Sequence, residues 1–161
     1  MMLRMDEPLP ILAAKAPARG RPSNYPEPFA SRMIGRTKQP LGDLFMLKNF
    51  GVNLVRLPPG SLSALHHRHT QQDEFIYVLE GTPTLHRGNE LHLLAPGMVV
   101  GFPKGGLAHH LENLSDADCV ILEVGDRSAG DCVSYPSDDI QATKAPDGRW
   151  LFTRKDGTPY I

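Results

Sequence analysis

Three histidines and one glutamate are spaced along this chain in a way that favours a metal site. All seven histidines of the 161 residues lie in the central part of the chain, and both flanks have none. His67 and His69 are two residues apart, so on a strand they share one face. Glu74 begins the next expected strand, and His109 belongs to a later one. Because imidazole and carboxylate together suit divalent first-row metals, we predict His67, His69, Glu74 and His109 as ligands of one ion.

The types of ligand narrow the choice of metal. The set contains no thiolate, and with three imidazoles Ca²⁺ and Mg²⁺ are disfavoured. We therefore expect one divalent transition metal: Mn, Fe, Ni, Co or Zn. Four protein ligands around an octahedral ion leave two adjacent positions for water or substrate. Open positions distinguish catalytic metal sites from structural ones.

The other four histidines are not expected to bind this ion. His66 would need residue 68 as its partner on the same face, and Arg68 cannot coordinate a metal. His110 is adjacent to a predicted ligand, so on a strand it points the other way, where it packs or forms a hydrogen bond. His86 and His92 flank an expected tight hairpin, and we expect both in solvent.

Composition excludes several classes of function. The hydrophobic fraction of 40% and the charged fraction of 22% are those of an ordinary globular domain. The net charge of −1, without a basic run, argues against a nucleic-acid partner. The apolar runs are too short to span a bilayer, so no membrane partner is expected. Cys119 and Cys132 make no disulfide framework, and free thiols indicate a cytoplasmic protein.

The chain divides into three parts by pattern. We expect residues 1–40, rich in proline, to form an arm that is either disordered at its start or draped over another surface. Residues 41–126 contain many short apolar runs separated by turn residues, which predicts an all-β antiparallel sandwich or barrel. Residues 127–161 form a polar tail with one strand, 150–154, added at a sheet edge. The expected barrel strands are 44–50, 52–57, 65–69, 74–79, 84–87, 90–94, 98–102, 108–112 and 118–124.

The strand predicted over 74–79 is apolar on both faces. Phe75, Tyr77 and Leu79 occupy one face, while Ile76 and Val78 occupy the other. A small barrel standing alone would expose one of these faces to water. We therefore expect a homodimer, with residues 20–40 or the strand near Trp150 crossing to the partner.

Two linked motifs resemble those of the cupin superfamily. The pattern His67-x-His69-x4-Glu74-x6-Gly81 is similar to the first cupin motif. Gly97-x5-Pro103-x-Gly105 followed by His109-x3-Asn113 is similar to the second. Two glycines depart from the pattern. Gly60 is one residue too far from His67, and Gly105 is one residue too far from His109. Both extra residues fall in turns, where insertions are tolerated. The resemblance covers residues 41–126.

This resemblance implies a jelly-roll barrel, also called a double-stranded β-helix, that is usually dimeric. It also implies the same four ligands, His67, His69, Glu74 and His109. The pocket beside the ligands is expected to be mostly apolar and to hold a small molecule. The strand residues expected to face it, on the same side of their strands as the ligands, are Ile76, Val78, Phe102 and Leu111. Gln72 is expected either to orient a ligand or to be exposed in a loop, and Arg56 to be an exposed strand residue.

Three functions are compatible with such a site, and fold alone does not choose among them. The first is a metal-dependent isomerase or epimerase of sugars or sugar phosphates. It is suggested by the run from Ser61 to Arg68, which is similar to the Ser-Leu-x-x-His-His-Arg run of cupin phosphomannose isomerases. That chemistry needs a general base and cationic phosphate ligands, which the sequence does not locate. The second is a non-haem metal dioxygenase, and the third is a non-catalytic binding protein for a small ligand.

Overall fold

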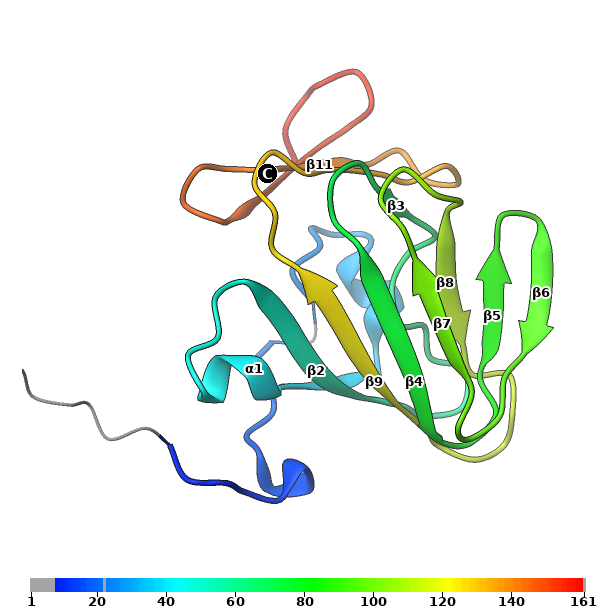
Figure 1. Ribbon diagram of the computed structural model, residues 1–161. Coiled ribbons are helices and arrows are strands. Elements are labelled where there is room, and N and C mark those ends of the chain that lie inside the picture. Colours follow the sequence, from blue (N-terminus) through cyan, green and yellow to red (C-terminus); the bar gives the residue numbers. More distant parts are fainter. Residues whose placement is uncertain (1–7, 22, 161) are drawn as a thin grey trace, which may run out of the picture.

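The computed structural model describes residues 8–21 and 23–160, and within them it is built almost wholly of antiparallel strands (Figure 1). The predicted all-β jelly-roll barrel is confirmed. Among the described residues no helix is long and apolar enough to cross a membrane. The elements are the 3₁₀ turns η1 (Ala13–Lys15) and η2 (Ala30–Met33), the helix α1 (Leu41–Leu44), and the strands β1 (Thr37–Pro40), β2 (Phe50–Leu57), β3 (Arg68–His69), β4 (Glu74–Glu80), β5 (Thr84–Arg87), β6 (Glu90–Leu93), β7 (Val99–Phe102), β8 (His109–Glu112), β9 (Cys119–Asp126), β10 (Cys132–Ser134), β11 (Gln141–Lys144) and β12 (Trp150–Thr153).

Two sheets enclose the main hydrophobic core. One has five strands in the order β1-β2-β9-β4-β7, and the other has three in the order β6-β5-β8. Alternate residues of a strand point to the same face of the sheet, so those that face the other sheet form the core. The alternation along β2 and β9 places Val55, Leu57 and Ile121 in the interior, where none has any exposed surface. The buried members of this core are Val55, Leu57, Ile76, Val78, Leu85, Leu94, Phe102, Leu111, Cys119 and Ile121.

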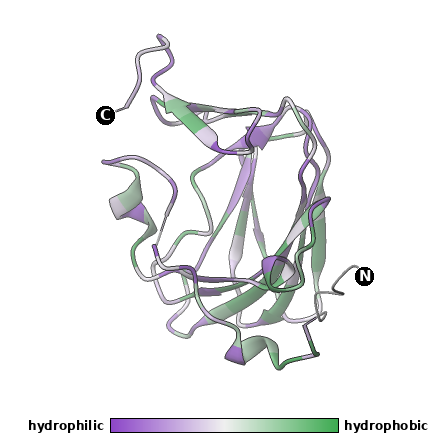
Figure 2. Ribbon diagram, turned by 90° about the vertical axis from the view of Figure 1, so that its left-hand side faces the viewer, coloured by the Kyte–Doolittle hydropathy of each residue, from purple (hydrophilic) through white to green (hydrophobic). Residues whose placement is uncertain are grey.

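The tail forms a third sheet across one end of the barrel. Its order is β12-β11-β10-β3, so the tail joins the barrel where Val133 pairs with His69 and Ser134 with Arg68. Figures 1 and 2 both show these strands at the upper end of the molecule. The predicted edge strand near Trp150 is confirmed as β12, which lies at the outer edge of this sheet.

The arm packs against the barrel and the tail of its own chain. Its last segment, β1, pairs with β2 and forms the edge of the five-stranded sheet. Upstream, Phe29 and Met33 are buried in a second hydrophobic cluster together with Tyr135 and Ile140 of the tail. The later part of the arm and the tail therefore pack against each other. The division at residues 40 and 126 stays a prediction, and residues 1–7 of the predicted arm lie outside the described residues.

Two predicted strands differ from the structure. The apolar run 44–50 is not a strand: α1 and a turn occupy it, and Met46 adopts a positive φ of 57°. The helical turn lies so close to β2 that a Cβ on Gly42 would come within 3.1 Å of the Val52 nitrogen. The run has no alternation of apolar and polar residues, so its apolar content alone was not evidence for a strand. The strand expected over 65–69 is shorter, because only Arg68 and His69 are in a ladder.

The hairpin predicted at Gly88-Asn89 is confirmed, since β5 and β6 pair on either side of it.

Two residues of the cupin-like motifs, Gly81 and Asn113, have structural roles. Gly81 has a φ of 76°, and a Cβ there would lie 2.6 Å from the Asp118 carbonyl oxygen, so only glycine fits. Asn113 is fully buried and donates its amide hydrogens to the Leu57 and Ala117 carbonyls, both at 2.7 Å. This amide ties the turn before β9 to the end of β2.

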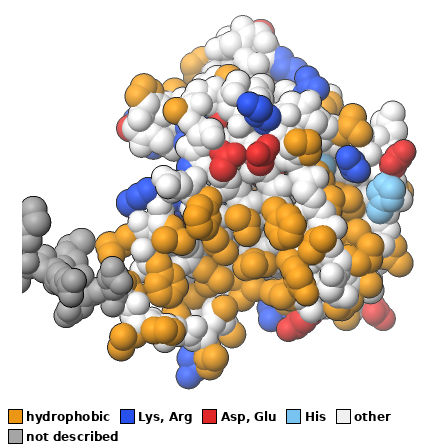
Figure 3. Space-filling view, in the orientation of Figure 1, with side chains coloured by type: hydrophobic (Ala, Val, Ile, Leu, Met, Phe, Trp, Pro, Cys, Tyr) orange, Lys and Arg blue, Asp and Glu red, His pale blue; other side chains and the backbone are white. Residues whose placement is uncertain are grey.

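One face of the five-stranded sheet is apolar and exposed. Phe75, Tyr77 and Leu79 of β4 keep 40%, 39% and 41% of their surface, whereas Ile76 and Val78 on the inner face are buried. Figure 3 shows hydrophobic side chains gathered over this sheet. An apolar patch of this kind marks an interaction surface. The exposed face therefore supports the homodimer proposal, while the crossing of residues 20–40 or of the strand near Trp150 to a partner stays a prediction.

We expect Phe75→Lys to break the dimer, because it places a charge in the centre of the apolar face that a partner would bury. Light scattering at micromolar concentration should give twice the mass of one chain for the parent and a single-chain mass for the variant. Leu93→Lys is the matched control, since Leu93 is 70% exposed on β6 of the other sheet. A parent protein that is monomeric would refute the homodimer.

Candidate metal centre

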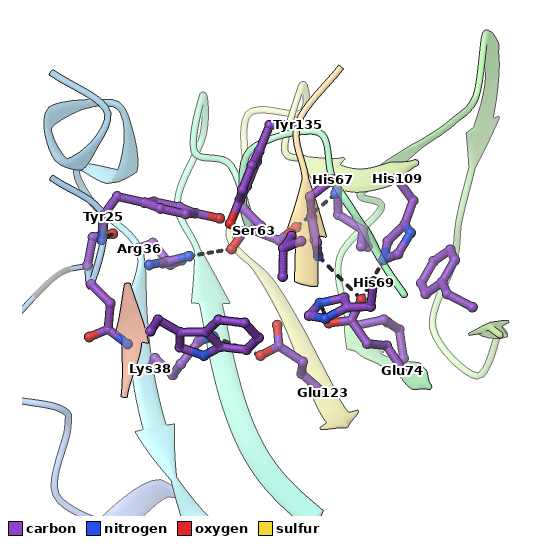
Figure 4. A pocket seen from close by; sticks show the side chains of 18 of the residues that line it. Tyr25, Arg36, Lys38, Ser63, His67, His69, Glu74, His109, Glu123 and Tyr135 are labelled. Atoms are coloured by element: carbon purple, nitrogen blue, oxygen red, sulfur yellow. Dashed lines mark hydrogen bonds and ion pairs between the residues drawn. The ribbon is translucent and has the colours of Figure 1, made fainter. Parts of the chain in front are cut away.

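The structure brings all four predicted ligands together at one end of the barrel (Figure 4). His67 and His69 come from the segment that ends in β3, Glu74 is the first residue of β4, and His109 is the first of β8. An isolated bridge pairs His67 with His109. Ligand atoms of His67, His69 and Glu74 lie within 4.8 Å of one another. The Nε2 atom of His109 is 2.7 Å from a carboxylate oxygen of Glu74.

The backbone fixes the orientation of two of the imidazoles. His67 donates its Nδ1 hydrogen to the Leu65 carbonyl at 2.7 Å, and His109 donates its Nδ1 hydrogen to the Leu107 carbonyl at 3.2 Å. A neutral imidazole that donates through Nδ1 presents the Nε2 lone pair on its other side. Both Nε2 atoms face Glu74.

The third imidazole is held by a carboxylate from the tail. Asp131 has no exposed surface, and its Oδ2 lies 2.5 Å from Nδ1 of His69. Its other oxygen accepts the backbone N–H groups of Thr70 and Gln71 at 3.0 and 2.8 Å. A carboxylate behind a histidine fixes its tautomer and strengthens it as a metal ligand. The sequence analysis did not identify Asp131.

The distances fit a shared ion. The Nε2 atoms of His67, His69 and His109 are 3.3, 3.5 and 2.7 Å from the nearest oxygen of Glu74. Ligand atoms around one ion with bonds of about 2.0–2.1 Å are about 2.9–3.4 Å apart, so small shifts suffice. All three imidazoles turn Nε2 toward one carboxylate, as a ligand set requires. Metal binding by these four residues remains our proposal, and the donor chemistry fits it.

Electrostatics in the cluster is dominated by Glu74. Burial raises the pKa of its carboxyl, but the charge of His67 and hydrogen bonds from the three imidazoles outweigh it and hold the pKa well below the usual value. Burial also lowers the pKa of His69, yet Glu74 and Asp131 together raise it to about 9. In the metal-free protein His69 therefore holds a proton that an ion must displace.

Cationic side chains line the same pocket, which corrects the expectation of a mostly apolar cavity. Arg19 comes from the arm, Arg36 lies just before β1, and Lys38 lies within it. Arg36 donates to the Ser63 carbonyl, and the backbone N–H of Arg19 donates to the Lys38 carbonyl at 2.8 Å. Burial lowers the pKa of Arg19, and the nearby positive charge of Arg36 lowers it further. Such a group of partly buried cations is stabilised by an anion.

A second carboxylate faces this pocket from β9. Glu123 accepts hydrogen bonds from Lys38 at 2.7 Å and from the side-chain amide of Asn53 at 3.3 Å. Asn53 and Glu123 are directly paired between β2 and β9. Glu123 lies on the same face of β9 as the buried residues Cys119 and Ile121. A charged residue at an inward-facing position of a strand is unusual, and this pattern in the sequence could have identified Glu123 as a site residue.

Aromatic residues from the arm and the tail line the outer part of the pocket. Tyr25, Tyr135 and Trp150 all contribute to the lining. The rings of Tyr25 and Tyr135 meet edge to face with centroids 5.8 Å apart. Burial raises the pKa of both hydroxyls, so both stay protonated and can donate hydrogen bonds to a ligand.

The other predicted site residues had mixed outcomes. Ile76, Phe102 and Leu111 line the pocket as expected, whereas Val78 belongs to the core alone. Gln72 neither orients a ligand nor lies exposed: it is buried, and its amide donates to the Ser128 carbonyl at 3.0 Å. Arg56 is half-exposed beside Asp118, so the expectation of a surface residue is confirmed.

Among the remaining histidines, one expectation was wrong. His92 is exposed as expected, but His86 is partly buried, and its ring stacks on His110 with centroids 4.2 Å apart. The two residues are directly paired across β5 and β8, a contact that a local hairpin argument does not reveal. His110 forms the expected hydrogen bond, with His66 at 3.0 Å.

Comparison with known proteins agrees with this geometry. The family model for the cupin domain matches residues 53–125. A crystal structure of a cupin-superfamily sugar phosphate isomerase from Silicibacter pomeroyi is 37% identical, with a TM-score of 0.87 over 95% of this chain and 97% of that one. A protein designated a candidate sugar phosphate isomerase, from Acidithiobacillus ferrooxidans, is 32% identical, with a TM-score of 0.70 over 78% of this chain and 80% of that one.

More distant structures share the fold alone. The polyketide cyclase RemF of Streptomyces resistomycificus is 19% identical, with a TM-score of 0.60 over 73% of this chain and 78% of that one. No curated protein matches this chain. The chain belongs to the cupin superfamily, and the match to the Silicibacter pomeroyi structure, over 95% of this chain, includes the arm and the tail as well as the barrel.

We expect His67→Ala and His109→Ala each to remove one equivalent of bound ion while the barrel stays folded. Each change deletes a ligand but leaves the core between the sheets intact. Elemental analysis of protein purified without chelator measures the ion, and circular dichroism measures the fold. His92→Ala is the control, because His92 is exposed on β6. Parental metal content in either ligand variant would refute the assignment.

We expect the affinity for the ion to rise with pH up to about 9, because below that pH the ion must displace the proton of His69. The dependence should approach tenfold per pH unit between roughly 6.5 and 9. The raised pKa also stabilises the metal-free fold below about pH 6.5, and this contribution is lost as pH rises through about 9. Competition with a chromophoric chelator measures the affinity.

Asp131→Asn is the control for this pH dependence. It removes the charge that helps to raise the pKa of His69 but keeps a similar shape. The variant should bind the ion about 10- to 100-fold more weakly at high pH and show a flatter dependence. Parallel curves for parent and variant would contradict the role given to Asp131.

Proposed function

We propose that this protein is a metal-dependent enzyme that isomerises or epimerises a small sugar phosphate. The observation that carries the proposal is that one pocket holds the His67, His69, Glu74 and His109 cluster together with Arg19, Arg36 and Lys38. A phosphorylated sugar presents hydroxyl or carbonyl oxygens at one end and a dianion at the other. The pocket has complementary groups for both.

The phosphate is assigned to the cationic part of the pocket. Guanidinium groups bind phosphate oxygens in pairs, and lysine adds a point charge. The mutual repulsion between Arg19 and Arg36 is relieved when an anion enters. The names of two relatives, a sugar phosphate isomerase from Silicibacter pomeroyi and a candidate sugar phosphate isomerase from Acidithiobacillus ferrooxidans, support the same substrate class.

The reaction also needs a group that moves a proton, and the sequence did not locate one. A bound divalent ion would polarise a carbonyl or hydroxyl oxygen as a Lewis acid. Glu123 lines the pocket outside the metal cluster, and we assign it the transfer of a proton at its carboxylate oxygen. Its contacts with Lys38 and Asn53 hold the carboxylate in position. Tyr25 and Tyr135 stay protonated and orient sugar hydroxyls.

The decisive assay is turnover of a panel of aldose and ketose phosphates by protein reconstituted with Mn, Zn, Ni, Co or Fe, followed by NMR. We expect interconversion of at least one phosphorylated sugar and at least tenfold lower kcat/KM for its unphosphorylated form. Oxygen consumption recorded in parallel would instead favour a dioxygenase. Binding without turnover of any kind would favour a binding protein. The free thiols of Cys119 and Cys132 agree with the cytoplasm as the place of action.

We expect Arg19→Gln and Lys38→Met to raise KM for the phosphorylated substrate at least tenfold, since each removes one charge from the phosphate site. The effect of Arg19→Gln on the unphosphorylated sugar should be small, whereas Lys38→Met should also lower kcat for that sugar, because Lys38 holds Glu123 in position. Arg56→Gln is the matched control, because Arg56 lies on the neighbouring strand β2 but is half-exposed beside Asp118. Equal effects of the three changes, or equal turnover of both sugars, would overturn the proposal.

A further inference from the structure

A second group of metal-binding side chains lies on the other face of β8. Ligand atoms of His86, His110 and Glu112 lie within 4.8 Å of one another. His110 and Glu112 are two residues apart on β8 and share a face, opposite to that of His109. His86 lies on β5, directly across from His110. We call His86, His110 and Glu112 the outer cluster.

One pair of side chains in the outer cluster is already at the spacing of metal ligands. The Nε2 atom of His86 is 2.9 Å from a carboxylate oxygen of Glu112. This matches the separation of about 2.9–3.4 Å expected for two atoms bound to one ion. The rings of His86 and His110 stack at an interplanar angle of 16°, with centroids 4.2 Å apart, so one ring must turn for both imidazoles to point a lone pair at the same ion.

His66 supports the outer cluster from the segment before β3. Its Nδ1 lies 3.0 Å from the Nδ1 of His110, and the two rings meet edge to face. When His110 donates its Nδ1 hydrogen to His66, its Nε2 lone pair is free for a cation. A hydrogen bond behind a ligand histidine is the usual support of a metal site.

We propose that His86, His110 and Glu112 bind a second divalent transition metal, of the Zn²⁺ type, on the outside of the barrel. Two imidazoles and one carboxylate on rigid strands are a common set for such ions. The cluster borders a surface hollow lined also by Gly88, Asn89 and Leu91, so an ion and its water ligands have access.

Placement on both β5 and β8 gives such an ion a defined role. It would link the two strands across their ladder, beside the predicted inner ligand His109. His109 and His110 are neighbours on β8 but point to opposite faces, so the two sites have no ligand in common. The outer ion would thus cross-link β5 and β8, and water would occupy the coordination positions that the three side chains leave open.

The test is a titration of chelator-stripped full-length protein with Zn²⁺ alone, followed by isothermal calorimetry and competition with a chromophoric chelator. We expect the parent to bind two equivalents and His86→Gln to bind one. The matched control is His92→Gln: His92 also pairs with a glutamate, Glu90 at 3.1 Å, but on β6 outside the cluster. It should bind two equivalents. His67→Ala should lose the other equivalent and keep the outer one.

Glu112→Gln keeps the shape of the cluster while removing its charge. It therefore tests the outer metal site even if His86→Gln fails to fold. It should also lose the second equivalent. Two equivalents of unchanged affinity in Glu112→Gln, or a parent whose Zn²⁺ binding is lost entirely in His67→Ala, would overturn the proposal. The result does not depend on catalysis, so it separates this site from the proposed function.

Discussion

The carboxylate of Glu74 is the group on which the site depends, because three imidazoles from two other segments converge on it. Its position is set by β4, which lies between β7 and β9, so that Glu74 pairs with Phe102 of β7 on one side and Gly125 of β9 on the other. A shift of one residue in either ladder would turn the carboxylate out of the barrel. The strand register of the five-stranded sheet therefore determines whether Glu74 faces the three imidazoles.

The barrel and the four ligands could be predicted because their signals are local. The short apolar runs of β2, β4 and β9, each bounded by turn residues, and the spacing of His67, His69 and Glu74 are visible within a few residues of sequence. Asp131, Arg19 and Arg36 could not be assigned, because no local pattern reveals which distant segment will close over the pocket. The strand expected over 44–50 failed for the opposite reason, since apolar content without alternation does not specify a strand.

The arm and the tail distinguish this chain from a bare barrel. The barrel contributes the metal ligands and an apolar floor, which many proteins of this fold share without a common activity. The arm adds Arg19, β1 adds Lys38, and the tail adds Asp131 and Trp150. The positive charge of the pocket thus comes from segments outside the cupin motifs, and selectivity for an anionic ligand should follow these segments.

The place of Asp131 along the chain also bears on biosynthesis. As the polypeptide leaves the ribosome, β2 to β9 emerge before Asp131 and the strands that follow it. A nascent barrel can therefore gather its three imidazoles around Glu74 while His69 still lacks the carboxylate behind it. The strands that follow β9 complete both the hydrogen bond of His69 and the wall of the pocket, so the centre matures only after these strands have emerged.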